Sequence, residues 1–109
     1  MNWSIEYYSE KVQEELLELP EGLQARYIHL TNIMLSEGAY LGEPHTKALG
    51  DGLFELRLKG KEGIARVMYC TIVNNKITIL HIFIKKSQKI PKKELNLAKR
   101  RMKEVKERS

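Results

Sequence analysis

The stretch from Asp51 to Lys89 constrains the fold most, because it holds three hydrophobic runs rich in β-branched or aromatic residues. The runs cover Leu53–Leu58, Ile64–Val73 and Lys76–Lys85, and turn signals separate them at Gly60–Gly63 and at Asn74-Asn75. Asparagine tolerates the left-handed backbone that a two-residue hairpin turn requires. Three strands joined by two short turns predict an antiparallel meander.

Side-chain alternation in this meander draws attention to two arginines. Neighbouring residues of a strand point to opposite faces, so Arg57 shares a face with Leu53 and Glu55, and Arg66 interrupts the apolar second run. A charged side chain inside a central strand must be exposed or paired. Two interpretations remain open: a surface arginine paired with Glu55, or two arginines on the open sheet face, whose donor forks bind an anion.

Alternation along the third hydrophobic run, Lys76–Lys85, predicts which of its side chains share a face. Strict alternation places one set of side chains on one face: Ile77, Ile79, His81, Phe83 and Lys85. It places the other set on the opposite face: Thr78, Leu80, Ile82 and Ile84. Within the apolar sequence ILHIF, His81 is either a packed core histidine or a residue that transfers a proton.

Length and composition predict one domain, residues 1–109, large enough to fold alone. The segment Asn2–Tyr8 carries Glu6 and no long apolar core, so it does not resemble a signal peptide. No apolar segment reaches the ~18 residues of a membrane span. The lone cysteine, Cys70, is predicted to be a buried and inert thiol, which fits a cytoplasmic protein.

The net charge of +5 hides an asymmetry along the chain. Residues 1–84 carry a net charge of −3, whereas residues 85–109 carry +8. The basic block begins at Lys85-Lys86, directly at the end of the third strand, so it is attached to the sheet. A fixed positive patch of this kind attracts polyanions, of which nucleic acid is the common one.

The N-terminal half predicts a strand and a helical hairpin. Trp3–Tyr7 alternates with period two, and Ser9 is a suitable cap for the helix that follows it. Helical spacing then continues in two segments that Pro20 and Gly22 separate, and Gly38 ends the second. The two helices should cover one face of the sheet. Ala39–Gly50 is predicted to be a loop in which Lys47 is either solvent-exposed or close to a bound substrate.

A basic helix is predicted at the C-terminus. One narrow apolar stripe follows helical spacing: Leu95, Ala98, Met102 and Val105. Lys92 and Lys93 lie in the first turn, where the helix dipole disfavours cations. Either solvent screens the unfavourable interaction of these lysines with the helix dipole, or the helix start and its lysines bind a phosphate together.

Several site chemistries are not indicated. The three histidines show no zinc-ligand spacing, and one cysteine cannot build a Cys-rich metal site. Neither a glycine-rich phosphate loop nor a nucleophile elbow is present. We therefore expect no metal and no cofactor.

Three blocks carry a resemblance to a known family: KALGDGLFELR at Lys47–Arg57, ARVMY at Ala65–Tyr69, and ILHIFIKKSQKIPKKEL at Ile79–Leu95. Together, with AKRR at Ala98–Arg101, they resemble the RelE/HigB superfamily of toxins from bacterial toxin–antitoxin pairs, in its phage-derived, HigB-like branch. The resemblance implies an α+β fold: an antiparallel sheet like that of microbial ribonucleases, a helical hairpin on one face, and a basic C-terminal helix.

The resemblance also implies an activity and a set of site residues. The activity is an endoribonuclease that cleaves mRNA, usually on the ribosome, and inhibits translation. The implied catalytic residues are Arg57, Arg66 and Lys86, with His81 as a further candidate for proton transfer. The implied RNA-binding residues are Lys47, Lys85, Lys89, Lys92 and Lys93. The implied partners are mRNA, the ribosome and a cognate antitoxin, often a helix-turn-helix protein.

The chain departs from the family near its C-terminus, where many members carry a tyrosine or histidine. No tyrosine follows Tyr69 and no histidine follows His81, so the general acid and base are not assigned by the resemblance. The same basic surface suits a second interpretation, a nucleic-acid-binding protein without chemistry of its own.

Overall fold

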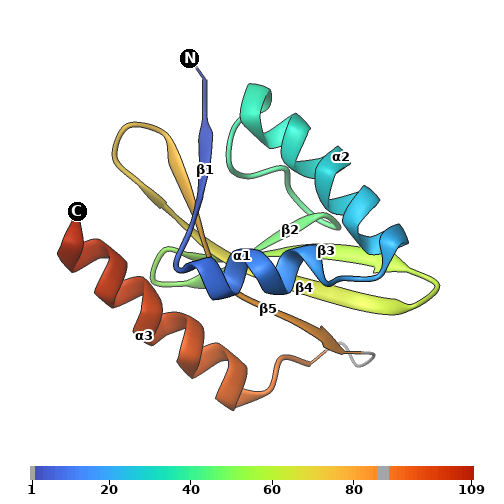
Figure 1. The fold of residues 1–109 in the computed structure, drawn as a ribbon. Coiled ribbons are helices and arrows are strands. Elements are labelled where there is room, and N and C mark those ends of the chain that lie inside the picture. Colours follow the sequence, from blue (N-terminus) through green and yellow to red (C-terminus); the bar gives the residue numbers. More distant parts are fainter. Residues whose placement is uncertain (1, 86–88) are drawn as a thin grey trace.

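The computed structural model describes residues 2–85 and 89–109, and within them the chain forms a five-stranded sheet between helices (Figure 1). The elements follow in this order: β1 (Ser4–Tyr7), α1 (Glu10–Leu17), α2 (Glu21–Glu37), β2 (Thr46–Gly50), β3 (Leu53–Gly60), β4 (Gly63–Ile72), β5 (Lys76–Lys85) and α3 (Lys92–Arg108). The predicted α+β class, helical hairpin and meander are confirmed. None of the described helices is long and apolar enough to cross a membrane.

The sheet has the strand order β1-β5-β4-β3-β2. Strands β2 to β5 are antiparallel to their neighbours, but β1 pairs with β5 in parallel, so the sheet is mixed. The prediction of a loop throughout Ala39–Gly50 is wrong, because β2 occupies its end and pairs with β3. Asp51 and Gly52 join these strands at positive φ, which is the Asp-Gly hairpin signal.

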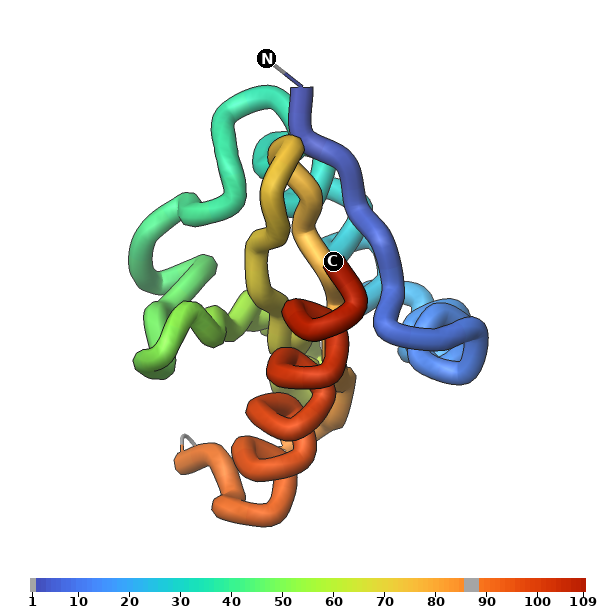
Figure 2. Tube along the Cα trace, turned by 90° about the vertical axis from the view of Figure 1, so that its left-hand side faces the viewer, coloured from blue at the N-terminus to red at the C-terminus, as the bar shows by residue number. Residues whose placement is uncertain are grey.

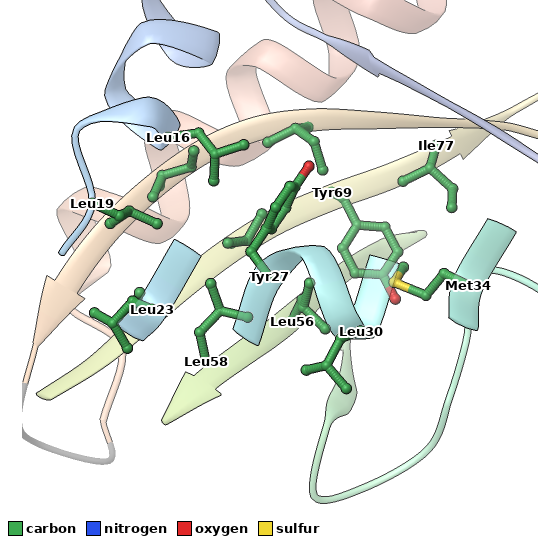
Figure 3. Packing of buried hydrophobic residues seen from close by; sticks show 14 of the residues in the cluster. Leu16, Leu19, Leu23, Tyr27, Leu30, Met34, Leu56, Leu58, Tyr69 and Ile77 are labelled. Carbon is green, nitrogen blue, oxygen red and sulfur yellow. The ribbon is translucent and has the colours of Figure 1, made fainter. Parts of the chain in front are cut away.

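One face of the sheet is covered by α1 and α2. The hydroxyl of Ser9 caps α1 by accepting a hydrogen bond from the backbone N–H of Val12 at 3.2 Å. Leucines of both helices pack on apolar side chains of the sheet, as Figure 3 shows for Leu23 and Leu58. Each fully buried leucine of this kind contributes about 1.5–3 kcal/mol to stability. We call this layer the hairpin-side core.

The opposite face is covered by α3, which runs along the sheet on the other side from α1 (Figure 2). The predicted stripe of α3 packs here, since Ala98, Met102 and Val105 are buried against the sheet. Cys70 is also buried in this layer, and burial raises the pKa of its thiol although Lys106 lies nearby. We call this layer the α3-side core.

A bulge in β5 divides its residues between the two layers. Met68 pairs with His81 and Tyr69 with Ile79, so Leu80 is an extra residue on β5. The predicted strict alternation is therefore wrong: Ile79 joins the hairpin-side core, whereas Phe83, which strict alternation places on the same face, packs on the α3-side core. A bulge changes which face the following residues occupy.

Candidate nucleic-acid interface

The strand register gathers basic side chains on the α3 side of the sheet. Arg57 pairs directly with Arg66, and Lys47 stands opposite Glu55. One step further along, Ile64 lies between Lys59 on β3 and Lys85 on β5. We define the cationic patch as the exposed lysines of this face and of the start of α3, together with Arg57: Lys47, Arg57, Lys59, Lys85, Lys89, Lys92 and Lys93.

A buried carboxylate holds both arginines. Arg57 Nε donates to Glu55 Oε1 at 2.7 Å, and Arg66 Nη1 donates to Glu55 Oε2 at 2.8 Å. Like charges directly opposite each other on two strands are unfavourable, and Glu55 between them offsets that repulsion. The Glu55 side chain is 0% exposed, so charge-assisted hydrogen bonds replace the water it has lost.

The two arginines differ in their access to solvent. The Arg66 side chain is only 1% exposed, whereas the Arg57 side chain is 17% exposed. The interpretation that places both arginines on an open face is therefore wrong for Arg66, and the alternative pairing with Glu55 is present for both. α3 crosses this face of the sheet, which alternation along one strand does not reveal. Of the two guanidinium groups, Arg57 is the one that reaches the surface.

His81 links the sheet to the start of α3. Its Nε2 lies 3.1 Å from Glu94 Oε1, and its ring stacks on Phe83 with centroids 5.5 Å apart. The side chain is 12% exposed, and its Nδ1 is buried with no hydrogen-bond partner among the described residues. Glu94 lies in the first turn of α3, where the helix dipole favours an acid. His81 is thus largely buried and already engaged.

The other predicted site residues are lysines, and those that the structure describes are exposed. Lys85 ends β5, Lys92 and Lys93 begin α3, and Lys89 lies between them. Lys89 is four positions after Lys85, a distance of at most about 14 Å along an extended chain. The strand end and the helix start therefore present their positive charges close together. Lys86, the third predicted catalytic residue, lies outside the described residues.

Sequence reasoning undervalued three residues of this region. The sequence suggests Glu55 only as the partner of a surface arginine, and its patterns point to neither Lys59 nor Glu94. The spacing Glu-x-Arg on a strand was the available signal for Glu55, because it places both side chains on one face. Nothing comparable identifies Glu94, which meets His81 only through the packing of α3. Across residues 2–85 and 89–109, no three His, Cys, Asp or Glu side chains gather that could hold a metal ion.

Comparison with known proteins places this geometry in a family. The fold is similar to a chain in the crystal structure of an archaeal RelE–RelB complex from Pyrococcus horikoshii OT3, with a TM-score of 0.62 and 21% sequence identity. The similarity covers 82% of this chain and 100% of that one. A search of curated proteins gave no match. A family model described as phage-derived protein Gp49-like matches residues 14–103, most of the chain, so this protein belongs to the Gp49-like family, in the RelE/HigB-like group that its motifs predict.

Proposed function

We propose that this chain is the toxin of a toxin–antitoxin pair, and that it cleaves mRNA on the ribosome, in the cytoplasm, and so inhibits translation. Membership of the Gp49-like family and the RelE-like fold support the toxin assignment. One observation carries the proposed chemistry: the partly exposed guanidinium of Arg57 is held by the buried Glu55 in the middle of the cationic patch. Such a group is preorganised to receive a phosphate.

The reaction needs four contributions from its surroundings. The 2′-hydroxyl of a ribose attacks the adjacent phosphate, so the site must position the phosphate, accept the 2′ proton, neutralise added negative charge and protonate the leaving oxygen. Arg57 contacts the phosphate and stabilises its charge in the transition state. Arg66 acts through Glu55, which it helps to hold in place. This division of roles follows the different exposure of the two arginines.

Binding of the RNA backbone falls to the lysines of the cationic patch: Lys47, Lys85, Lys89, Lys92 and Lys93. They are exposed and contact phosphates without reading bases. For proton transfer we propose Lys86, which the resemblance implies as a catalytic residue without assigning its role in the reaction. His81 is the second candidate, and it would have to leave Glu94 to reach a substrate. Ribosomal positioning of the message supplies much of the orientation.

The proposal is tested by adding the purified protein to translating ribosomes and mapping mRNA 5′ ends. New ends that appear only with ribosomes, and that vanish when the nucleotide before the cut lacks its 2′-hydroxyl, are expected. Binding to RNA without new ends would favour the second candidate function, a non-catalytic nucleic-acid-binding protein. The engagement of His81 by Glu94 is the observation that favours that alternative.

An antitoxin partner is part of the proposal. The RelE chain with the similar fold was solved as a complex with RelB, and this precedent supports a protein that binds and silences the present chain. Expression of the chain alone should arrest growth, and co-expression with the adjacent gene should restore it. Normal growth with abundant, folded protein would contradict the toxin assignment.

A further inference from the structure

A hollow lies at the end of α3 that is remote from Lys92 and Lys93. Its volume is about 460 Å³, and it lies between β1, the tip of the β4–β5 hairpin and the last turn of α3 (Figure 1). Residues from all three elements line it, among them Glu6, Tyr8, Ile72, Lys76, Thr78 and Arg108. α3 has 17 residues, so its two ends are about 25 Å apart. The hollow is therefore a separate surface from the cationic patch.

A threonine with a buried, unpaired hydroxyl lines this hollow. Thr78 lines it and is only 3% exposed, and its hydroxyl has no hydrogen-bond partner among the described residues. Buried polar groups in folded proteins are nearly always paired. A hydroxyl that is unpaired at the wall of an open hollow can be paired by a molecule that enters it.

The edge of the hollow at the hairpin tip is apolar. Val73 is 74% exposed at this tip, next to Ile72. A second hollow of about 280 Å³ shares Ile72, Val73 and Ser109 with the first, and it adds Thr71 and Lys106. We call the two hollows together the hairpin groove. Its most exposed apolar side chain, Val73, is aliphatic, which suits a protein segment better than stacked RNA bases.

The charges around the hairpin groove indicate the character of the partner. Lys76, Lys106 and Arg108 contribute three positive charges, whereas Glu6 contributes one negative charge and lies 3.6 Å from Lys76. The Arg108 guanidinium lies over the ring of Tyr8, 5.4 Å from its centroid. Complementary charge on a partner steers its approach and sets its register. A fitting segment carries an apolar anchor flanked by Asp or Glu.

We propose that the hairpin groove is the docking site of the antitoxin, which inserts an acidic segment with an aliphatic anchor between β1, the hairpin tip and α3. This inference rests on the proposed function, because it assumes that the chain has an antitoxin. The anchor packs on Ile72 and Val73, a polar group of the segment pairs with Thr78, and its acidic residues meet Arg108 and Lys106.

Binding of the purified product of the adjacent gene is the test, measured by calorimetry with wild-type chain and with single variants. Val73→Asp and Arg108→Glu should each raise the dissociation constant about tenfold or more, because a central anchor and a facing charge are lost. Thr78→Val should raise it about threefold. Two controls make the same changes on other surfaces, Leu17→Asp on α1 and Arg100→Glu on α3, and should bind like wild type.

Each result of this binding experiment either supports the proposed docking site or contradicts it. If Val73→Asp and Arg108→Glu bind the partner with wild-type affinity and have normal circular dichroism, the hairpin groove is not the docking site. The toxin proposal would remain intact. A loss of affinity in Arg100→Glu of equal size would assign binding to charge alone and also overturn the docking site. No binding to the wild-type chain would overturn the groove together with the antitoxin proposal, while growth arrest by the chain alone would still support the toxin. Selective loss in the groove variants supports the inference.

Discussion

The two faces of this one sheet are built differently. On the hairpin side, the inward positions of the meander are uniformly apolar and meet two helices: Leu56, Leu58, Ala65, Val67, Tyr69, Ile77, Ile79 and Ile82. On the α3 side, apolar residues such as Leu53 and Met68 share the face with Glu55 and Arg66, which are equally buried. Two helices provide enough apolar surface to cover one face, whereas the single helix α3 leaves the Arg57 side partly open. The face that remains partly open carries the charges.

This difference shows that stability and function are separated across the sheet. A buried ion cluster adds little net stability, since apolar residues of similar volume often serve as well or better. The Glu55 cluster is therefore best explained by what it holds, the guanidinium of Arg57 at the surface. Residues that break the apolar pattern expected of a buried sheet face are concentrated at functional sites. Four experiments test this separation.

The largest effect is expected from Glu55→Ala. It leaves Arg66 buried without its carboxylate, which should lower the free energy of unfolding by about 3–5 kcal/mol. Urea denaturation measures the change, and Glu62→Ala, an exposed glutamate in the β3–β4 turn, should shift it by no more than about 0.5 kcal/mol. The double variant Glu55→Leu, Arg66→Met should recover most of the loss. A Glu55→Ala protein as stable as wild type would mean that the cluster is not a buried charge network.

Arg57→Ala should slow mRNA cleavage with little change in the stability of the fold. Loss of one preorganised donor to the phosphate should slow mRNA cleavage about a hundredfold, equivalent to roughly 3 kcal/mol of transition-state stabilisation. The unfolding free energy should change far less than in Glu55→Ala, because Arg57 is partly exposed and Arg66 keeps its partner. Lys61→Ala in the β3–β4 turn is the matched control and should cleave like wild type. Undiminished cleavage by folded Arg57→Ala would remove this residue from the site.

Alkaline pH should weaken the hairpin-side core. Burial, reinforced at Tyr27 by the hydrogen bond with Tyr7, raises the pKa of Tyr27 and Tyr69 above the ordinary 10.0. The unfolded chain then loses phenolic protons at lower pH than the folded chain. The contribution of these tyrosines to the free energy of unfolding is therefore constant below about pH 10 and falls as the pH rises above it. The expected slope is up to about 1.4 kcal/mol per pH unit for each tyrosine. Urea unfolding between pH 8 and 11 measures it.

Single substitutions assign that slope to the tyrosines of the core. Tyr69→Phe should reduce the slope by about half, although it also removes the hydrogen bond from Tyr69 Oη to the Ala39 carbonyl and so lowers stability at neutral pH. An identical slope in Tyr69→Phe would contradict the burial argument.

The smallest effect on the fold is expected from replacing Lys92 and Lys93 by Gln. Binding to RNA should weaken about equally for all sequences, and the salt dependence should flatten by up to roughly 1.4 log units per log unit of salt. Stability should be unchanged or slightly higher, because two cations leave the first turn of α3. Lys11→Gln on α1 is the control and should keep the wild-type slope. A wild-type slope in the double variant would show that the start of α3 faces away from RNA.

Much of the fold could be predicted from the sequence, because its signals are local. Period-two runs and Asn-Asn or glycine turns identified β3, β4 and β5, and helical spacing with Ser9 and Gly38 identified the hairpin. β2 is not predicted, since five residues of which only Leu49 is a large apolar one give no clear period and depend on β3 for pairing. The direction of β1 beside β5 was equally out of reach, because pairing between distant strands has no local mark.

By itself, the sequence determined which residues of β3 and β4 share a face, the separation of acidic and basic segments, and the family. Only the tertiary structure decided how deep each residue lies and what it meets. Arg57 and Arg66 have the same pattern in sequence, yet α3 crosses the sheet so that one guanidinium is buried and the other reaches the surface. The contact of His81 with Glu94 likewise forms only where α3 packs on β5, and the bulge at Leu80 appears only in the pairing of β5 with β4. Alternation sets the direction of a side chain through backbone geometry, whereas burial depends on which distant segment lies over it.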